Sequence, residues 1–141
     1  MLLLNFLKYL GVTLPLMAFA VFLFTLTTPY GEFKIMFDGD QLEDRKKVAA
    51  ARAVAYDLGG KVIALAILMA SAVYHSVNLW DLIVWGLTGS VFLVAVYYLF
   101  EFLTPGITIR KEIPNGNVAV GIFSFCLSIS TGVLMAALIS Y

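Results

Sequence analysis

Ionisable residues at the edges of long apolar segments are the first candidates for chemistry in this sequence. Asp57 and Lys61 are four residues apart, in the acid-first order that favours an ion pair on one face of a helix. Glu101 ends another apolar run, one turn before Thr104-Pro105, where it can meet Lys61 or Arg110. Ionisable residues within membrane segments are functional candidates by default. We expect Asp57, Lys61 and Glu101 at the membrane surface, because each stands near the predicted end of a span.

Small residues recur every four positions near the C-terminus, and this spacing aligns them on one helix face. A repeated small-xxx-small face lets two membrane helices approach closely, and its hydroxyl groups can also line a pathway. Ala66 and Ala70 stand at corresponding positions of the first half, which favours packing over a lining role. The face consists of Ser124, Ser128, Gly132 and Ala136.

No set of residues in the chain suggests an active site. There is one histidine, no Ser/His/Asp set, no glycine-rich phosphate loop and no cluster of metal ligands. We therefore expect no catalytic residue, no metal and no cofactor. The single cysteine, Cys126, stands within the last apolar block and is expected to be a packed core thiol.

The composition places these residues in a membrane protein. The 141-residue chain is 62% hydrophobic, and its apolar residues gather in blocks near the roughly 20 residues that span a bilayer. The formal net charge is zero, so no overall basic field would attract nucleic acid. We predict an all-α integral membrane protein with one domain, residues 1–141, and four transmembrane helices that form two helical hairpins.

The first apolar block, residues 2–28, has two interpretations. Ala18-Phe19-Ala20 resembles the cleavage site of a signal peptide. No basic region precedes the block, however, and the apolar run continues past that site. We therefore favour a transmembrane helix.

The loops on one side of the predicted bundle contain two segments in which polar and apolar residues alternate. Residues 32–37 and 107–113 have this alternation, which predicts two short strands that can pair with each other. Asp40 with Glu43 has the form of a capping box, so a helical extension over about 41–57 should begin in water. Asn115 or Asn117 can cap the last helix.

Basic residues concentrate in these same loops and predict the orientation of the chain. By the positive-inside rule, loops 29–58 and 104–115 are cytoplasmic and both termini lie outside. Four of the basic residues stand just above the membrane surface, where they can contact anionic lipid or a partner protein. These four are Arg45, Lys46, Lys47 and Arg52.

The two halves of the chain align as a duplicated hairpin. Thr28-Pro29 matches Thr104-Pro105, and Leu68-Met69-Ala70 matches Leu134-Met135-Ala136. We assign repeat one to residues 1–76 and repeat two to residues 77–141. Each repeat crosses the membrane twice, so the two repeats are parallel.

The residues that open the last helix resemble a known family. Asn115-Gly116-Asn117, within the run from Ile113 to Gly121, is similar to the Gly-Asn-x-Ala signature of small bacterial inner-membrane proteins like YjfL. The first half lacks this signature, since Ala50-Ala51-Arg52-Ala53 stands in its place. The resemblance implies a multi-pass protein of the bacterial inner membrane, with four helices and no established activity.

These features lead to two functional hypotheses. The first is a non-enzymatic membrane module that self-associates or docks onto partner proteins, for which the extension over about 41–57 is the expected docking element. The alternative is an oligomeric ion channel or small-solute transporter, suggested by the repeat and by the Ser/Thr/Gly face of the last helix.

Overall fold

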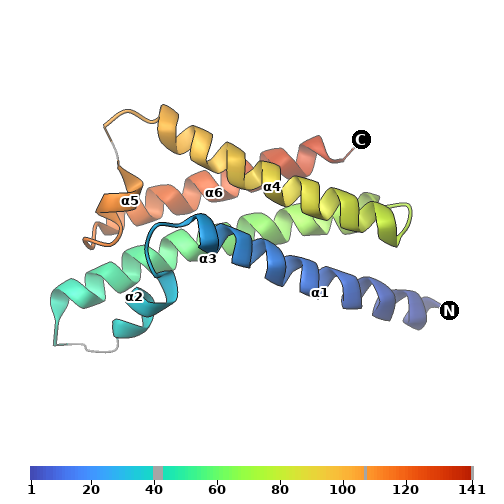
Figure 1. The fold of residues 1–141 in the computed structure, drawn as a ribbon, viewed down its shortest axis with the longest axis horizontal. Coiled ribbons are helices and arrows are strands. Elements are labelled where there is room, and N and C mark those ends of the chain that lie inside the picture. The colour runs from blue at the N-terminus through green and yellow to red at the C-terminus, as the bar shows by residue number, and fades with distance from the viewer. Residues whose placement is uncertain (40–42, 107, 141) are drawn as a thin grey trace.

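The computed structural model describes residues 1–39, 43–106 and 108–140. In these residues it has six helices and no strand (Figure 1). Four helices are long and apolar enough to cross a membrane, which confirms the predicted all-α fold with four candidate spans. The elements are α1 (Leu2–Thr27), α2 (Glu32–Asp38), α3 (Arg45–His75), α4 (Leu79–Leu103), α5 (Ile109–Glu112) and α6 (Val118–Leu138).

The short helices α2 and α5 lie at one end of the bundle, which we call the α2–α5 end (Figure 1). Both termini and the turn between α3 and α4 lie at the opposite end. In each half of the chain a short helix stands between two long ones. The 31 residues of α3 reach roughly 46 Å at 1.5 Å per residue, so α3 is longer than the hydrocarbon core of about 30 Å.

The predicted strands are wrong, because both segments are helical in the described residues. In α2, Glu32, Ile35 and Met36 follow the i, i+3, i+4 spacing of one helix face, and α2 packs on α3. In the second segment, Ile109 and Ile113 are four residues apart and both buried. The burial of one face at helical spacing outweighs the alternation of polar and apolar residues; residue 107 lies outside the described residues.

Side chains cap both α3 and α6 at their N-terminal ends. The N-cap of α3 is Asp44, whose Oδ1 accepts hydrogen bonds from the backbone N–H groups of Lys46 (3.1 Å) and Lys47 (3.3 Å). The expected cap Asp40 and the start of the extension at residue 41 lie outside the described residues. The N-cap of α6 is Asn117, whose Oδ1 accepts a hydrogen bond from the backbone N–H of Val120.

Helices α3 and α6 make the closest helix pair, and glycines allow their approach. A Cβ atom on Gly60 of α3 would lie 2.6 Å from Cα of Phe125 on α6. A Cβ atom on Gly121 or Gly132 of α6 would lie within 2.8 Å of backbone atoms of Ala53 or Ala64. Because these neighbours are backbone atoms that cannot turn aside, the α3–α6 contact requires glycine at all three positions.

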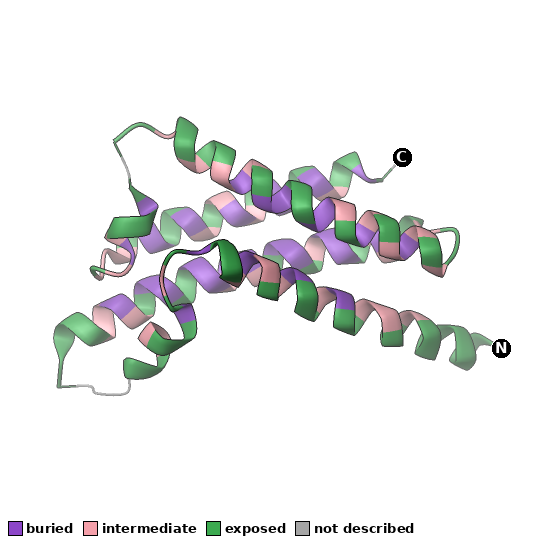
Figure 2. Cartoon of the chain, viewed as in Figure 1, coloured by how far each residue is buried: buried purple, intermediate pink, exposed green. Residues whose placement is uncertain are grey.

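The apolar core has two parts. The larger part lies among the four long helices and includes Leu65, Leu68, Leu82 and Leu93, and the smaller part lies around Val54, Ile109 and Ile113 at the α2–α5 end. Helix α1 contributes least to the core, since 11% of its most apolar 18-residue segment is buried, against 56% for that of α3 (Figure 2). Most of α1 is therefore available to lipid or to another helix.

Candidate functional site

A group of buried polar side chains lies between the two parts of the core, near the α2–α5 end. Asp57 and Lys61 come from α3, and the others come from α4, α6, α2 and the segment after α1. All of them are buried except Tyr30, which is partly exposed. We call this group the polar cluster; it consists of Thr28, Tyr30, Glu32, Asp57, Lys61, Tyr97 and Ser124.

Asp57 is the acceptor at the centre of the cluster. Its Oδ2 accepts hydrogen bonds from the Tyr30 hydroxyl at 2.6 Å and from Lys61 Nζ at 2.8 Å. Its Oδ1 accepts from the Ser124 hydroxyl, and the Tyr97 hydroxyl lies 3.2 Å from the same oxygen. Several donors on both oxygens are the arrangement that suits an ionised carboxylate.

Lys61 joins the two carboxylates of the cluster. Its Nζ lies 2.8 Å from Asp57 Oδ2 and 3.0 Å from Glu32 Oε1, and it also donates to Thr28 Oγ1 at 3.1 Å. These three acceptors match the three N–H bonds of an ammonium group. The ammonium also lies 5.4 Å from the ring centroids of Phe24 and Tyr97, which adds cation–π attraction in a dry site.

Glu32 has a carboxylate oxygen without a partner. Its Oε1 accepts from Lys61 and, at 3.3 Å, from the Thr28 hydroxyl, whereas its buried Oε2 has no hydrogen-bond partner among the described residues. Burial raises the pKa of Glu32 above its ordinary value, although the Lys61 ammonium acts in the opposite direction. With all groups ionised, the two carboxylates and one ammonium would leave one negative charge in excess, and a proton on Glu32 removes it.

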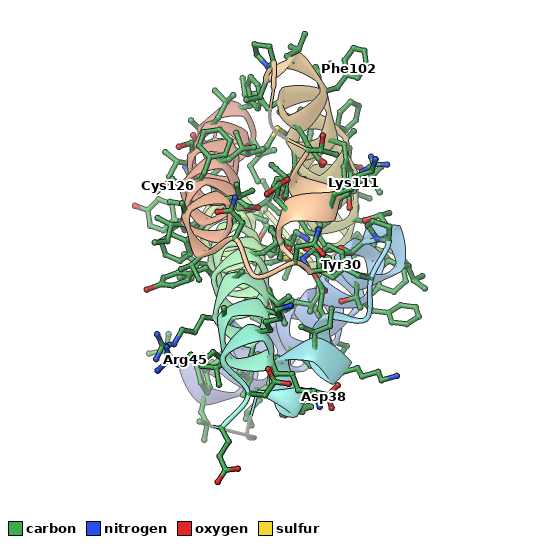
Figure 3. The ribbon with its side chains drawn as sticks, turned by 90° about the vertical axis from the view of Figure 1, so that its left-hand side faces the viewer. Tyr30, Asp38, Arg45, Phe102, Lys111 and Cys126 are labelled. Atoms are coloured by element: carbon green, nitrogen blue, oxygen red, sulfur yellow. The ribbon has the colours of Figure 1, made fainter. Side chains whose placement is uncertain are left out.

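Tyr30 lies among the helices at the α2–α5 end (Figure 3). Burial and the neighbouring Asp57 carboxylate raise the pKa of the Tyr30 hydroxyl far above its ordinary value. Tyr30 therefore remains a neutral hydrogen-bond donor to Asp57 throughout the physiological pH range.

The charges expected at the membrane surface have two different environments. Asp57 and Lys61 form the predicted ion pair, but their exposed fractions are 0% and 2%, so the pair lies inside the bundle. The physical reason is that α2 packs on α3 and brings Glu32 to Lys61, which closes the site from water. Glu101 pairs with Arg110, with Nε 3.5 Å from Oε1, at the edge of the bundle.

The small residues of α6 have different neighbours. Ser124 belongs to the polar cluster, and Gly132 packs against Ala64 of α3. The Ser128 hydroxyl is buried and has no hydrogen-bond partner among the described residues. Ala136 is only partly buried, so the close contact with α3 fades toward the C-terminal end of α6.

The Asn115-Gly116-Asn117 motif forms the entry to α6. Gly116 has a φ of +86°, which favours glycine, and a Cβ atom there would lie 3.1 Å from that of Ala49. Asn117 caps the helix, and its Nδ2 donates to Glu112 Oε2 at 2.9 Å. Asn115 is exposed. The motif therefore joins α5 to α6 and lies apart from the polar cluster.

The four basic candidates lie in the first turns of α3. Arg45 and Arg52 are exposed and flank a groove that also contains Val48 and Val118. Lys46 and Lys47 line a second groove, beside Asp38 and Pro114. Their proposed contact with anionic lipid or a partner remains a prediction.

Cys126 does not lie in the predicted core environment. It is exposed on the outer surface of the bundle and is not a packed core thiol (Figure 3). The reason is its register on α6, since Ser124 and Ser128, two residues away on either side, occupy the face toward the bundle.

The sequence patterns do not identify most partners of the Asp57–Lys61 pair. Glu32 falls in a predicted strand and Tyr30 in a predicted loop, and no pattern in the sequence connects Tyr97 with the pair. A usable signal was present, because an Asp and a Lys in an otherwise apolar span need buried partners. Glu32 and Tyr30 follow the end of the neighbouring span directly and could have supplied them.

Comparisons with known proteins agree with the assignment of this chain as a membrane protein. The family described as Domain of Unknown Function (DUF350) matches residues 1–139. The UPF0719 transmembrane protein YshE of Bacillus subtilis (strain 168) is 40% identical over 85 residues, which are 60% of this chain and 63% of that protein. The match thus covers less than two thirds of either chain. No solved structure matches. Since the family match covers nearly the whole sequence, the chain belongs to the DUF350 family.

Proposed function

We propose that this chain is a non-enzymatic membrane transporter module that binds and releases a proton at Glu32 in the polar cluster. The supporting observation is the Glu32 carboxyl group, which is 1% exposed and has one oxygen without a hydrogen-bond partner in the part of the chain that the structure describes. Lys61 provides one positive charge for two carboxylates. A proton on Glu32 makes the cluster neutral, and its release restores the excess charge.

The position of the cluster favours a transporter over an open channel. The cluster lies close to the α2–α5 end, and the larger part of the core separates it from the end that contains the termini. The side chains of Leu65, Leu68, Leu82 and Leu93 in that core have exposed fractions of 0%. A closed site that lies nearer to one end of the bundle fits an occluded state of alternating access.

Substitution Glu32→Gln tests the proposal because glutamine has a similar shape and cannot bind a proton in this pH range. The wild-type protein in lipid should show the C=O band of a buried carboxylic acid in infrared difference spectra recorded between low and high pH. Because burial raises the pKa of Glu32, the band should persist above pH 4.5, the ordinary value, and vanish as the pH rises further. The Glu32→Gln protein should lack the band and should not carry protons into liposomes under an imposed potential.

Glu43→Gln provides the matched control, because Glu43 is exposed and its substitution makes the same chemical change. This variant should keep both the band and the proton flux. A wild-type protein without the band, or a folded Glu32→Gln protein with unchanged flux, would contradict the proposal.

Self-association is a second candidate, favoured by an apolar groove between α1 and α3. The groove has a volume of about 480 Å³ and is walled by Leu14 and Met17 of α1 and by Ala66 and Ala70 of α3. Two alanines four residues apart permit close approach of another helix. We propose that a helix of a second copy occupies this groove, as in an oligomeric transporter.

Substitution Ala70→Phe should fill the groove and convert the assembled protein into monomers. Native mass spectrometry of the protein extracted with its lipids would measure the change. Ala137→Phe, at an exposed position of α6, should leave the mass of the assembly unaltered. A wild-type protein that is monomeric under these conditions would exclude the second copy and leave the groove to lipid.

Sequence features support a proposal for the cellular setting. We propose the bacterial inner membrane, as the resemblance to proteins like YjfL implies, with the α2–α5 end in the cytoplasm by the positive-inside rule. The polar cluster would then exchange protons with the cytoplasm.

A further inference from the structure

A small cavity adjoins the polar cluster on the side of α4 and α5. It has a volume of about 10 Å³, which is room for about one water molecule. Lys61 and Tyr30 line its inner side, and Glu101 and Arg110 also border it. The cavity therefore lies between the buried ammonium and a charged pair at the edge of the bundle.

The outer wall of the cavity is the Glu101–Arg110 pair. The Arg110 side chain is 56% exposed and that of Glu101 is 10% exposed, so one partner contacts water and the other faces inward. The guanidinium carbon of Arg110 lies 5.3 Å from the ring centroid of Tyr98, and the Tyr98 hydroxyl donates to Thr27 Oγ1 at 3.1 Å. Arg110 thus covers the cavity through contacts that an exposed side chain can break at low cost.

Every helix of the structure presents polar groups toward the cavity or the adjoining cluster, either itself or through the segment that follows it. Among the residues that the structure describes, only Glu101 combines an ionisable carboxyl group, a place in the cavity wall and an ion-pair partner that is exposed to water. The groups are Thr28 and Tyr30 after α1, Glu32 of α2, Asp57 and Lys61 of α3, Tyr97, Tyr98 and Glu101 of α4, Arg110 of α5 and Ser124 of α6.

We propose that this cavity is the route by which protons pass between water and Glu32, with Glu101 as the relay and Arg110 as the gate. The inference rests on the proposed function of the polar cluster. It adds two residues that lie outside the cluster and the direction from which the proton enters.

The geometry allows a balanced transfer. Glu101 takes up a proton from the solvent when Arg110 swings away, and the protonated Glu101 then borders the cavity that can hold a water molecule. Lys61 gives a proton to Glu32 Oε1, 3.0 Å from its Nζ, and regains one from that water molecule, which is restored by the proton of Glu101. The net change is one proton on Glu32, with Glu101 ionised and Lys61 charged as before.

The test measures how fast the infrared band of the Glu32 carboxylic acid shifts when the protein in lipid is mixed with heavy water. Glu101→Gln should slow this exchange on the order of 10²-fold, the lower end of what a positioned acid–base group contributes. Arg110→Gln should speed it, because the gate is lost. Lys111→Gln, at the exposed residue next to Arg110, should leave the rate unchanged.

The outcomes separate this inference from the proposed function. If the wild-type band is present but both Glu101→Gln and Arg110→Gln exchange at the wild-type rate, the route is wrong and proton binding at Glu32 stands. If the wild-type protein lacks the band, the proposed function itself fails. Should Glu101→Gln not fold, Arg110→Gln alone decides, because Arg110 is an exposed residue of a four-residue helix.

Discussion

Replacing Lys61 by methionine should destabilise the protein by about 3–5 kcal/mol, the usual effect of removing one partner from a buried ion pair. Methionine fills a similar volume but leaves Asp57 and Glu32 without their shared positive charge. The two carboxylates would then face each other across a site that excludes water. Denaturant-induced unfolding of the protein in bicelles would measure the difference in free energy.

Two comparisons show whether the loss comes from uncompensated charge. Lys34→Met, at an exposed lysine of α2, should change the free energy of unfolding by no more than about 0.5 kcal/mol. The triple variant Lys61→Met, Asp57→Asn, Glu32→Gln should recover much of the lost stability, because it buries no charge. Equal stability of Lys61→Met and Lys34→Met would show that the ion pair does not hold the bundle together.

The adjacent glycines of α3 provide the second large effect. Gly60→Ala should destabilise the protein by about 1–3 kcal/mol or more, since the new Cβ would lie 2.6 Å from Cα of Phe125 and push α3 away from α6. Gly59→Ala should stabilise it by up to about 1 kcal/mol, because the new Cβ would have no packing neighbour within 4 Å among the described residues and alanine favours a helix. Unfolding measurements under the same conditions would compare the two variants.

Gly59→Ala is the control for Gly60→Ala, because the same methyl group is added to neighbouring residues of one helix. Opposite signs are expected. If Gly60→Ala were as stable as Gly59→Ala, helices α3 and α6 would not be in close contact, and Ser124 would not lie beside Asp57.

The sequence predicted the elements of this fold well wherever the length of an apolar segment decides the structure. The four long helices follow from blocks near the length of a bilayer crossing, and the structure has helices at each of them. The two short segments were misassigned because six or seven residues of alternating polarity also fit one face of a helix. In α2 the burial of Glu32 beside Lys61 decides between these structures, and that contact depends on residues far away in the sequence.

The site could be predicted only in part, for the same reason. The spacing of Asp57 and Lys61 predicts their pairing. The recurrence of small residues every four positions placed Ser124 on the small-residue face of α6. No local pattern indicates that Tyr30 and Tyr97 would donate to the same carboxylate, because they come from different elements that meet only in the folded bundle. The burial of the Asp57–Lys61 pair could not be predicted either, because it depends on the packing of α2 over the pair.

The position of the polar cluster near one end of the bundle also has an electrical meaning. Tyr97 and Ser124 stand six residues inside the ends of α4 and α6, roughly 9 Å along a helix, in a hydrocarbon core of about 30 Å. If the ends of α4 and α6 lie at the edge of the hydrocarbon core, a proton that moves between water and the cluster crosses up to about a third of the membrane voltage. At about 2.3 kcal/mol per charge for each 100 mV, this fraction amounts to about 0.7 kcal/mol. We therefore expect the proposed proton binding at Glu32 to respond to the membrane voltage as well as to the pH.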